Sequence, residues 1–289
     1  MNAPVLNQAV ARQQHFWDWR AAGNYIGGGS GAGALIYAAL AWPGSRPVVL
    51  AGLALVGLGL LCVWAEIGRP LRAFNVFFNP ATSWMTREAV VATLLLPLGL
   101  AAWWLASAGL AAAAALLAAG YVYCQARMIQ AARGIPAWRH PRTVPLMLAT
   151  GLAEGAGIGL AAQVVIGGTP PAWAAAWLAG LVVLRQLAFA AWRRGLAQAG
   201  APRGTHAVIG GFGRRLVGLD AAAVVLAAAW ALWQDSTWLA AVAGLAAALG
   251  GGWFKLTLVT RAAYHQGLAI PVTPVRGAGT THPGARPGW

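Results

Sequence analysis

The sequence predicts an all-α integral membrane protein. Hydrophobic residues make up 59% of the 289 residues and charged residues only 9%, and the mean hydropathy is +0.62. Sixteen tryptophans lie mostly near the ends of apolar runs, where amphipathic rings anchor at lipid headgroups. Because a transmembrane helix needs roughly 20 apolar residues, we expect eight of them. Their predicted ranges are 21–41, 47–65, 85–105, 108–129, 143–166, 171–192, 215–234 and 237–258.

These spans make residues 1–260 one eight-helix transmembrane domain, followed by a Gly- and Pro-rich tail over 261–289. The glycine-rich first and fifth spans suggest two four-helix halves. The first twenty residues are polar and aromatic and do not show an apolar core followed by a small-residue cleavage site. The sequence therefore predicts no cleavable signal peptide. The first span is therefore expected to direct insertion itself.

In a soluble protein a net charge of +14 would suggest a nucleic-acid partner. In a membrane protein the distribution of the positive charges between the two sides of the membrane is more informative. With eight spans both termini share one side, and that side collects nearly all the arginines, whereas the other has only Arg46 and Asp235. The positive-inside rule places the termini in the cytoplasm of a bacterial inner membrane. Anionic lipid accounts for most of these arginines, and a docked acidic partner adds to that account. They are Arg12, Arg20, Arg133, Arg139, Arg142, Arg193, Arg194, Arg203, Arg214, Arg261, Arg276 and Arg286, with those of the 66–84 segment.

The cysteines and histidines exclude several cofactors from this chain. Cys62 and Cys124 lie inside predicted spans without a C-x-x-C motif, so we expect neither a disulfide nor an iron–sulfur cluster. A membrane haem b needs histidines within the spans, and all five histidines lie in loops, tails or span ends. We therefore predict no haem and no metal site in the chain.

The segment between the second and third spans, residues 66–88, concentrates charge and aromatic side chains. Pro70 suits a first helical position, and Asn79–Pro80 forces a turn that ends such a helix. Ser83 can then cap the next helix, which puts Arg87 and Glu88 about one turn inside it. The sequence predicts an interfacial helix here and a polar pocket at one membrane face.

The other spans also contain polar residues, and some of these allow two interpretations. The glycines after Asn24 either allow close helix packing or make room beside Asn24 for a flat ligand. Tyr123 ends the fourth span and is typical of an interface anchor. Glu154 lies mid-membrane, either as a functional carboxylate or as a protonated side chain bonded to a neighbouring helix. Asp220 and Lys255 lie at similar depth and could pair with each other.

The run IGRPLRAFNVFFNPATSWMTREA resembles the signature of the membrane-anchor family typified by the dimethyl sulfoxide reductase anchor subunit (DmsC), with NrfD-like and polysulfide reductase anchors as more distant relatives. WDWRAAGNYIGGGSGAG and ARMIQAARGIPAW support the resemblance, which covers about the N-terminal half. It implies an eight-helix anchor that holds an iron–sulfur, ferredoxin-like subunit, which in turn contacts a molybdopterin (Mo or W) catalytic subunit. The anchor itself lacks the catalytic centre and exchanges electrons and protons with ubiquinone or menaquinone, at a site within about 1–142.

Residue by residue, the resemblance implies that Glu88 is the acidic residue of the quinone site. Glu66 stands where the dimethyl sulfoxide reductase anchor has a histidine, so a carboxylate would have to replace a histidine-based proton route. We expect both glutamates to transfer protons to the quinone. The residues expected to line the quinone pocket are Asn24, Arg69, Asn75, Ser83, Arg87 and Tyr123.

The chemistry of quinones fits these residue types, because it requires donors to two carbonyl oxygens, a proton carrier and an apolar slot. The alternative is that Glu66 and Glu88 only form ion pairs with Arg69 and Arg87. A different class of function, an ion or solute transporter with Glu154 as the coupling site, would act as a lone chain. If the anchor docks its partners in the cytoplasm, oxidation of an intracellular substrate with reduction of quinone is favoured over quinol oxidation by a terminal reductase.

Overall fold

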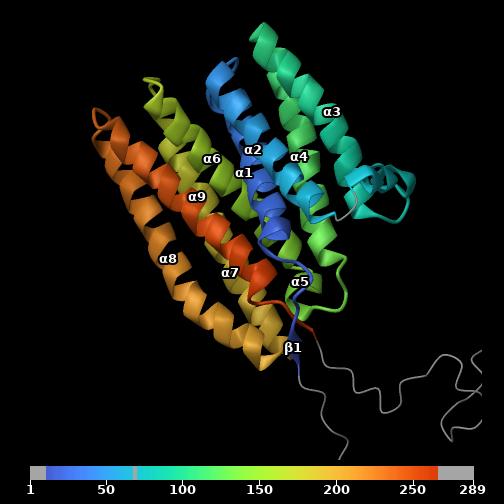
Figure 1. Ribbon diagram of the computed structural model, residues 1–289. Helices are drawn as coiled ribbons and strands as arrows, with labels where there is room; N and C mark the ends of the chain where they lie inside the picture. Colours follow the sequence, from blue (N-terminus) through green and yellow to red (C-terminus); the bar gives the residue numbers. More distant parts are fainter. Residues whose placement is uncertain (1–10, 68–69, 266–289) are drawn as a thin grey trace, which may run out of the picture.

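A computed structural model of the chain describes residues 11–67 and 70–265, and Figure 1 shows an elongated bundle of long helices. Seven helices in the described part are long and apolar enough to cross a membrane. The predicted class, an all-α membrane protein, is confirmed. The long helices are α1 (Trp19–Ala41), α2 (Arg46–Glu66), α3 (Trp84–Leu105), α4 (Ala108–Gln130), α6 (Thr143–Val165), α7 (Trp173–Gln198), α8 (Arg203–Leu232) and α9 (Thr237–Thr260).

Helix α1 is as long as the others but is not among those seven. Its glycines, its serine, its asparagine and its two tyrosines lower its hydropathy below that of its neighbours. Most of its residues are nevertheless buried, because α1 packs against α2, α4, α6 and α9. A helix surrounded by protein does not need lipid-facing leucines.

Two helices extend beyond the spans predicted for them. Helix α8 begins at Arg203 rather than at 215, and α7 continues to Gln198 rather than ending at 192. The apolar run marks only the part of a helix inside the membrane, whereas arginine and glutamine continue the helix beyond it. The break comes at Gly200, which adopts a left-handed φ of 64°, and at Pro202, which precedes α8.

The segment between α2 and α3 folds as predicted, with one change of helix type. Residues Pro70–Phe78 form the 3-10 helix η1, and the chain turns at Asn79–Pro80. Ser83 caps α3 by accepting a hydrogen bond from the Thr86 N–H at 3.2 Å. The Thr86 hydroxyl donates to the Val76 carbonyl at 2.5 Å and so ties η1 to the first turn of α3. Figure 1 shows this segment at the side of the bundle, beside the start of α3.

Glycines bring α1 into backbone contact with its neighbours. A Cβ atom on Gly59 of α2 would lie 2.8 Å from the backbone nitrogen of Gly28, and one on Gly155 of α6 would lie 2.1 Å from the carbonyl carbon of Gly33. Neither position has room for a methyl group. The packing interpretation of the glycines in the first span is therefore confirmed.

The two ends of the described chain meet at the end of the bundle where α1 begins. Strand β1 (Arg12–Gln13) pairs antiparallel with β2 (Tyr264–His265), and the short helix α5 (Pro136–Arg139) contacts β2. The Trp138 indole donates to the Leu258 carbonyl of α9 at 3.0 Å. The remainder of the predicted tail, residues 266–289, lies outside the described residues.

This packing generates a paired prediction on α2. We expect Gly59→Ala to destabilise the protein by about 1–3 kcal/mol, because the new methyl group meets the α1 backbone. Gly57→Ala is the matched control, since a Cβ on Gly57 has nothing within 4 Å. Thermal unfolding of the two variants in detergent measures the difference. Equal midpoints for the two variants would show that the α1–α2 contact is not as close as described.

Candidate functional site

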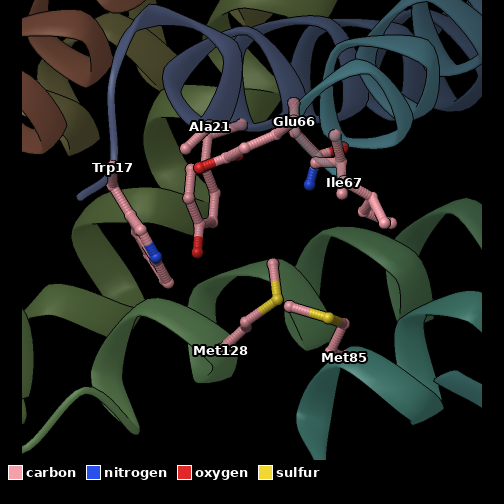
Figure 2. A pocket seen from close by; sticks show the side chains of 9 residues that line it. Trp17, Ala21, Glu66, Ile67, Met85 and Met128 are labelled. Carbon is pink, nitrogen blue, oxygen red and sulfur yellow. The ribbon is translucent and has the colours of Figure 1, made fainter. Parts of the chain in front are cut away.

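A cavity of about 230 Å³ lies at the end of the bundle where α1 and α3 begin and α2 and α4 end. Figure 2 shows Met85 and Met128 on one side of it, with Glu66 and Ile67 opposite them and Trp17 closing a third side. The lining is mostly apolar, as is usual for sites that bind organic ligands. The lining residues are Trp17, Ala21, Asn24, Tyr25, Val63, Glu66, Ile67, Met85 and Met128.

Trp17 forms one wall of the cavity and is held in place by contacts with Gln14, with α9 and with α5. Gln14 accepts from the Trp17 N–H at 2.8 Å and donates both to the Trp17 carbonyl at 2.7 Å and to the Val259 carbonyl of α9 at 2.8 Å. The Trp17 ring also stacks on Trp138 of α5, with 4.8 Å between centroids. The cavity is lined by the N-terminal half of the chain, and α9 helps to hold one of its walls in place.

Two buried oxygens in the cavity wall have no hydrogen-bond partner among the residues that the structure describes. They are Asn24 Oδ1 and the Tyr25 hydroxyl, on adjacent residues of α1. A buried polar atom without a partner costs about 1–3 kcal/mol, so such atoms in a cavity indicate a site that a polar ligand or water completes. The Tyr25 hydroxyl can donate to a ligand carbonyl, and Asn24 Oδ1 can accept from a ligand hydroxyl.

Glu88 lies directly behind Asn24. Its side chain is buried, and Oε1 accepts from Asn24 Nδ2 at 3.3 Å and from Gln125 Nε2 at 3.0 Å. The Gln125 amide also donates to the Asn24 backbone carbonyl at 3.0 Å, and it lies 3.5 Å from the Tyr121 hydroxyl. Asn24 thus bridges the cavity and the buried carboxyl group. Sequence reasoning did not assign Gln125 to the site, although its i, i+4 spacing from Tyr121 puts both on one face of α4.

Glu66 lines the cavity at its outer edge and is half-buried. Arg20 donates to the neighbouring Ala65 carbonyl at 3.2 Å, which puts a guanidinium group close to Glu66. Arg20 also pairs with Asp18 at 2.8 Å, and this hydrogen-bonded pair holds the pKa of the Asp18 carboxyl below its ordinary value. Asp18 therefore stays ionised at neutral pH and keeps its capping bond to α1.

The other predicted site residues lie away from the cavity lining. Arg87 donates to the Pro80 and Ala81 carbonyls at 2.9 and 2.7 Å, and Ser83 caps α3. Tyr123 is 39% exposed, and its hydroxyl accepts from Arg127 at 3.1 Å.

Two further predictions concern η1 and the segment before it. Asn75 is exposed on η1, and Arg69 lies outside the described residues. The alternative explanation required ion pairs of the two glutamates with Arg69 and Arg87. Among the described residues no ion pair joins Glu88 to Arg87, and a pair with Arg69 falls outside those residues.

Two ion pairs lie deep in the other half of the bundle. Lys255 of α9 pairs with Glu154 of α6 at 2.5 Å, and Ser30 of α1 donates to the same carboxylate oxygen at 2.9 Å. Arg185 of α7 forms a bidentate pair with Asp220 of α8. The predicted pairing of Asp220 with Lys255 is wrong, because Asp220 pairs with Arg185 of α7 and Lys255 pairs with Glu154 of α6. Arg185 was missed, although a single arginine in an apolar run is itself a signal.

The two ion pairs approach each other beside Gly251. A Cβ atom on Gly251 would lie within 2.7 Å of both Glu154 Oε1 and Arg185 Nη1. All four charged side chains are at least 98% buried. A mutually neutralised cluster is the arrangement that makes charges tolerable inside a membrane.

The fold and the site together define a polytopic membrane protein with an apolar, ligand-sized cavity. Glu66 lies at the edge of this cavity, and Glu88 lies behind its wall. Residues 44–200 match the family described as the DMSO reductase anchor subunit (DmsC). Since the match covers more than half of the sequence, the chain belongs to this family. It is thus a membrane anchor subunit of a molybdopterin oxidoreductase. A comparison with curated protein sequences gave no match.

The family match runs from the start of α2 to the end of α7. It includes the 66–88 segment and the end of α4, on which the resemblance was based, and it extends beyond the N-terminal half. The glycine-rich opening of α1 lies outside the matched range.

Proposed function

We propose that this anchor subunit is the quinone-reactive member of its complex, passing electrons between a partner iron–sulfur subunit and membrane quinone. The observation that carries the proposal is the pair of unpartnered oxygens, Asn24 Oδ1 and the Tyr25 hydroxyl, in a cavity edged by Glu66 and backed by Glu88. A quinone headgroup has two oxygens that accept hydrogen bonds when oxidised and donate them when reduced. One donor and one acceptor side by side suit both forms.

The cavity lining fits a quinone headgroup in the remaining respects. The Met85 and Met128 side chains offer polarizable, adaptable surfaces for a flat ring. Val63 and Ile67 extend the apolar wall on the α2 side, where an isoprenoid tail can leave the site. Ubiquinone and menaquinone share these features, and the lining does not distinguish between them.

Reduction of a quinone to a quinol takes up two electrons and two protons, so the site needs proton carriers. Glu66 is half-buried at the edge of the cavity and can exchange protons with water. Glu88 is buried one hydrogen bond behind Asn24 and can hold a proton close to the ligand without direct solvent contact. Gln125 and Asn24 keep the Glu88 carboxyl in place.

Electrons reach the site from outside the chain in this proposal. The sequence predicts no haem and no iron–sulfur cluster of its own, so a cluster in a ferredoxin-like partner must approach the cavity closely. The partner then docks at the end of the bundle that carries η1 and α5, and it holds a molybdopterin (Mo or W) catalytic subunit in turn.

We also propose eight spans, with α1 as the eighth, arranged as halves α1–α4 and α6–α9 that meet along α1 and α6. Arginine-rich loops lie at the end with the cavity, which supports cytoplasmic termini in an inner membrane. A catalytic subunit docked in the cytoplasm meets intracellular substrates, which favours oxidation of substrate and reduction of quinone. The opposite direction, oxidation of quinol by a terminal reductase, is the second candidate.

The role of Glu88 is tested by Glu88→Gln, which keeps the shape and removes the proton carrier. We expect quinone-linked turnover of the intact complex to fall at least about 10-fold, while reduction of an artificial dye by the catalytic subunit stays unchanged. Asp235→Asn, in the exposed α8–α9 loop at the other end, is the control for loss of a carboxylate. Quinone turnover at the wild-type rate in Glu88→Gln would refute the assignment.

The orientation is tested with single cysteines at Asn79 and Thr169, both exposed and at opposite ends, in a Cys62→Ala/Cys124→Ala background. With cytoplasmic termini and eight spans, a membrane-impermeant thiol reagent labels only the Thr169 position in intact cells. Labelling of the Asn79 position alone would show that the termini lie outside the cytoplasm. It would also remove the argument that electrons flow from substrate to quinone. Labelling of both or of neither would contradict the eight-span topology.

A further inference from the structure

A second, basic pocket of about 550 Å³ lies beside the proposed quinone cavity. Two of its residues, Trp84 and Arg127, directly precede Met85 and Met128 of the cavity wall, so the same two helix ends line both spaces. Its polar lining distinguishes it from the cavity. The lining residues are Thr82, Trp84, Arg127, Gln130, Ala131, Arg133 and Arg139.

Arg127 is held in this pocket by aromatic rings and not by a carboxylate. Its guanidinium lies 4.6 Å from the Trp84 ring centroid and donates to the Tyr123 hydroxyl at 3.1 Å. Arg87 covers the same indole at 4.2 Å, so positive charge gathers around Trp84. The Arg127 Nε atom is buried and has no hydrogen-bond partner among the described residues. Its N–H is therefore available to an acceptor from outside the chain.

The chain has few carboxylates with which to balance this charge. Only six Asp and Glu residues occur in it, and all six lie in the described ranges. Three of them form ion pairs elsewhere in the chain, namely Asp18, Glu154 and Asp220. Glu88 accepts hydrogen bonds from side-chain amides. Glu66 borders the other cavity, and Asp235 lies in the α8–α9 loop. The six carboxylates therefore leave Arg127 and Arg133 available to an anion from outside the chain.

The position of the pocket shows what kind of anion fits. Trp84 and Arg127 are residues of α3 and α4, two helices that can cross the membrane, and aromatic side chains at helix ends mark the headgroup level. Farther along these helices, apolar side chains face outward: Leu94 of α3, on the helix face of Arg87, is 55% exposed, and Leu116 of α4, on the helix face of Arg127, is 77% exposed. These residues form an apolar strip. A soluble anion would use the arginines only. A phospholipid would use both the arginines and the apolar strip.

We propose that this pocket binds the phosphate of an anionic phospholipid, with Arg127 and Arg133 as its cationic contacts and the acyl chains along the outer faces of α3 and α4. The Gln130 side chain supplies a neutral hydrogen-bond donor for a remaining phosphate oxygen, whereas the Thr82 hydroxyl already donates to Asn79 Oδ1 at 2.9 Å. Because Met85 and Met128 follow the lipid-binding residues directly, the bound lipid braces the helix ends that form one wall of the quinone cavity.

The test uses the full-length chain, delipidated in detergent and titrated with short-chain phosphatidylglycerol, phosphatidylcholine or soluble glycerol phosphate. Native mass spectrometry counts the bound molecules, and thermal unfolding reports stabilisation. We expect phosphatidylglycerol to bind preferentially and Arg127→Gln/Arg133→Gln to weaken it about 10-fold. The matched control is Arg193→Gln/Arg215→Gln, which removes two arginines that also lie over aromatic rings, on α7 and α8. This control should bind phosphatidylglycerol as the wild type does.

Several results would overturn the proposal. Equal binding of the two lipids, or equal loss in the control, would mean a general surface effect. Competition by glycerol phosphate at the same concentration would mean a site for a free phosphate. Loss of the iron–sulfur partner without a change in lipid binding would mean that the pocket docks protein. If the double variant does not fold, Arg133→Gln alone serves, because Arg133 is exposed in a loop.

Discussion

The close approach of α1 to its neighbours is the constraint on which the other features of the structure depend. Polar groups inside a bilayer must find partners within the protein, and glycine-lined contacts bring α1 close enough to supply them on two sides. Asn24 reaches Glu88, Ser30 reaches Glu154, and the Tyr25 carbonyl accepts from Lys255 at 2.8 Å. A wider helix spacing would leave those side chains buried without partners, which is the costlier state.

The contrast between the two polar regions indicates where a ligand belongs. The charges of the cluster around Glu154 and Arg185 neutralise one another in two ion pairs, although Glu154 Oε1 has no hydrogen-bond partner among the described residues. The cavity at the start of α1 is open, with two oxygens unsatisfied and with walls that belong to four helices and to the segment before α1. Mutual neutralisation makes buried charges tolerable, whereas unpartnered oxygens in the wall of a ligand-sized cavity are available to a ligand. This difference favours the cavity over the mid-membrane carboxylate as the functional centre.

Much of the fold could be predicted from the sequence, because lipid imposes simple rules. Apolar run length gave the helices, and Ser83 and Asn79–Pro80 marked their ends near the 66–88 segment. Partners across helices could not be predicted, since periodicity does not say which faces meet. Similar depth in the membrane therefore suggested Lys255 as the partner of Asp220, whereas the structure pairs Asp220 with Arg185, which sequence reasoning overlooked. Asn24 and Glu66 were named from their position beside one membrane face, but the contributions of Trp17, Met85 and Met128 to the cavity depend on packing between distant segments.

The central claim is that the cavity at the start of α1 binds the quinone headgroup, and photolabelling tests it most directly. An azido-quinone irradiated with the intact complex should label peptides that contain Trp17–Tyr25, Met85 or Met128, and excess unmodified quinone should suppress the labelling. Mass spectrometry of the digested subunit identifies the sites. Quinone-suppressible labelling confined to α7, α8 or α9, with the α1 peptide unlabelled, would contradict the account.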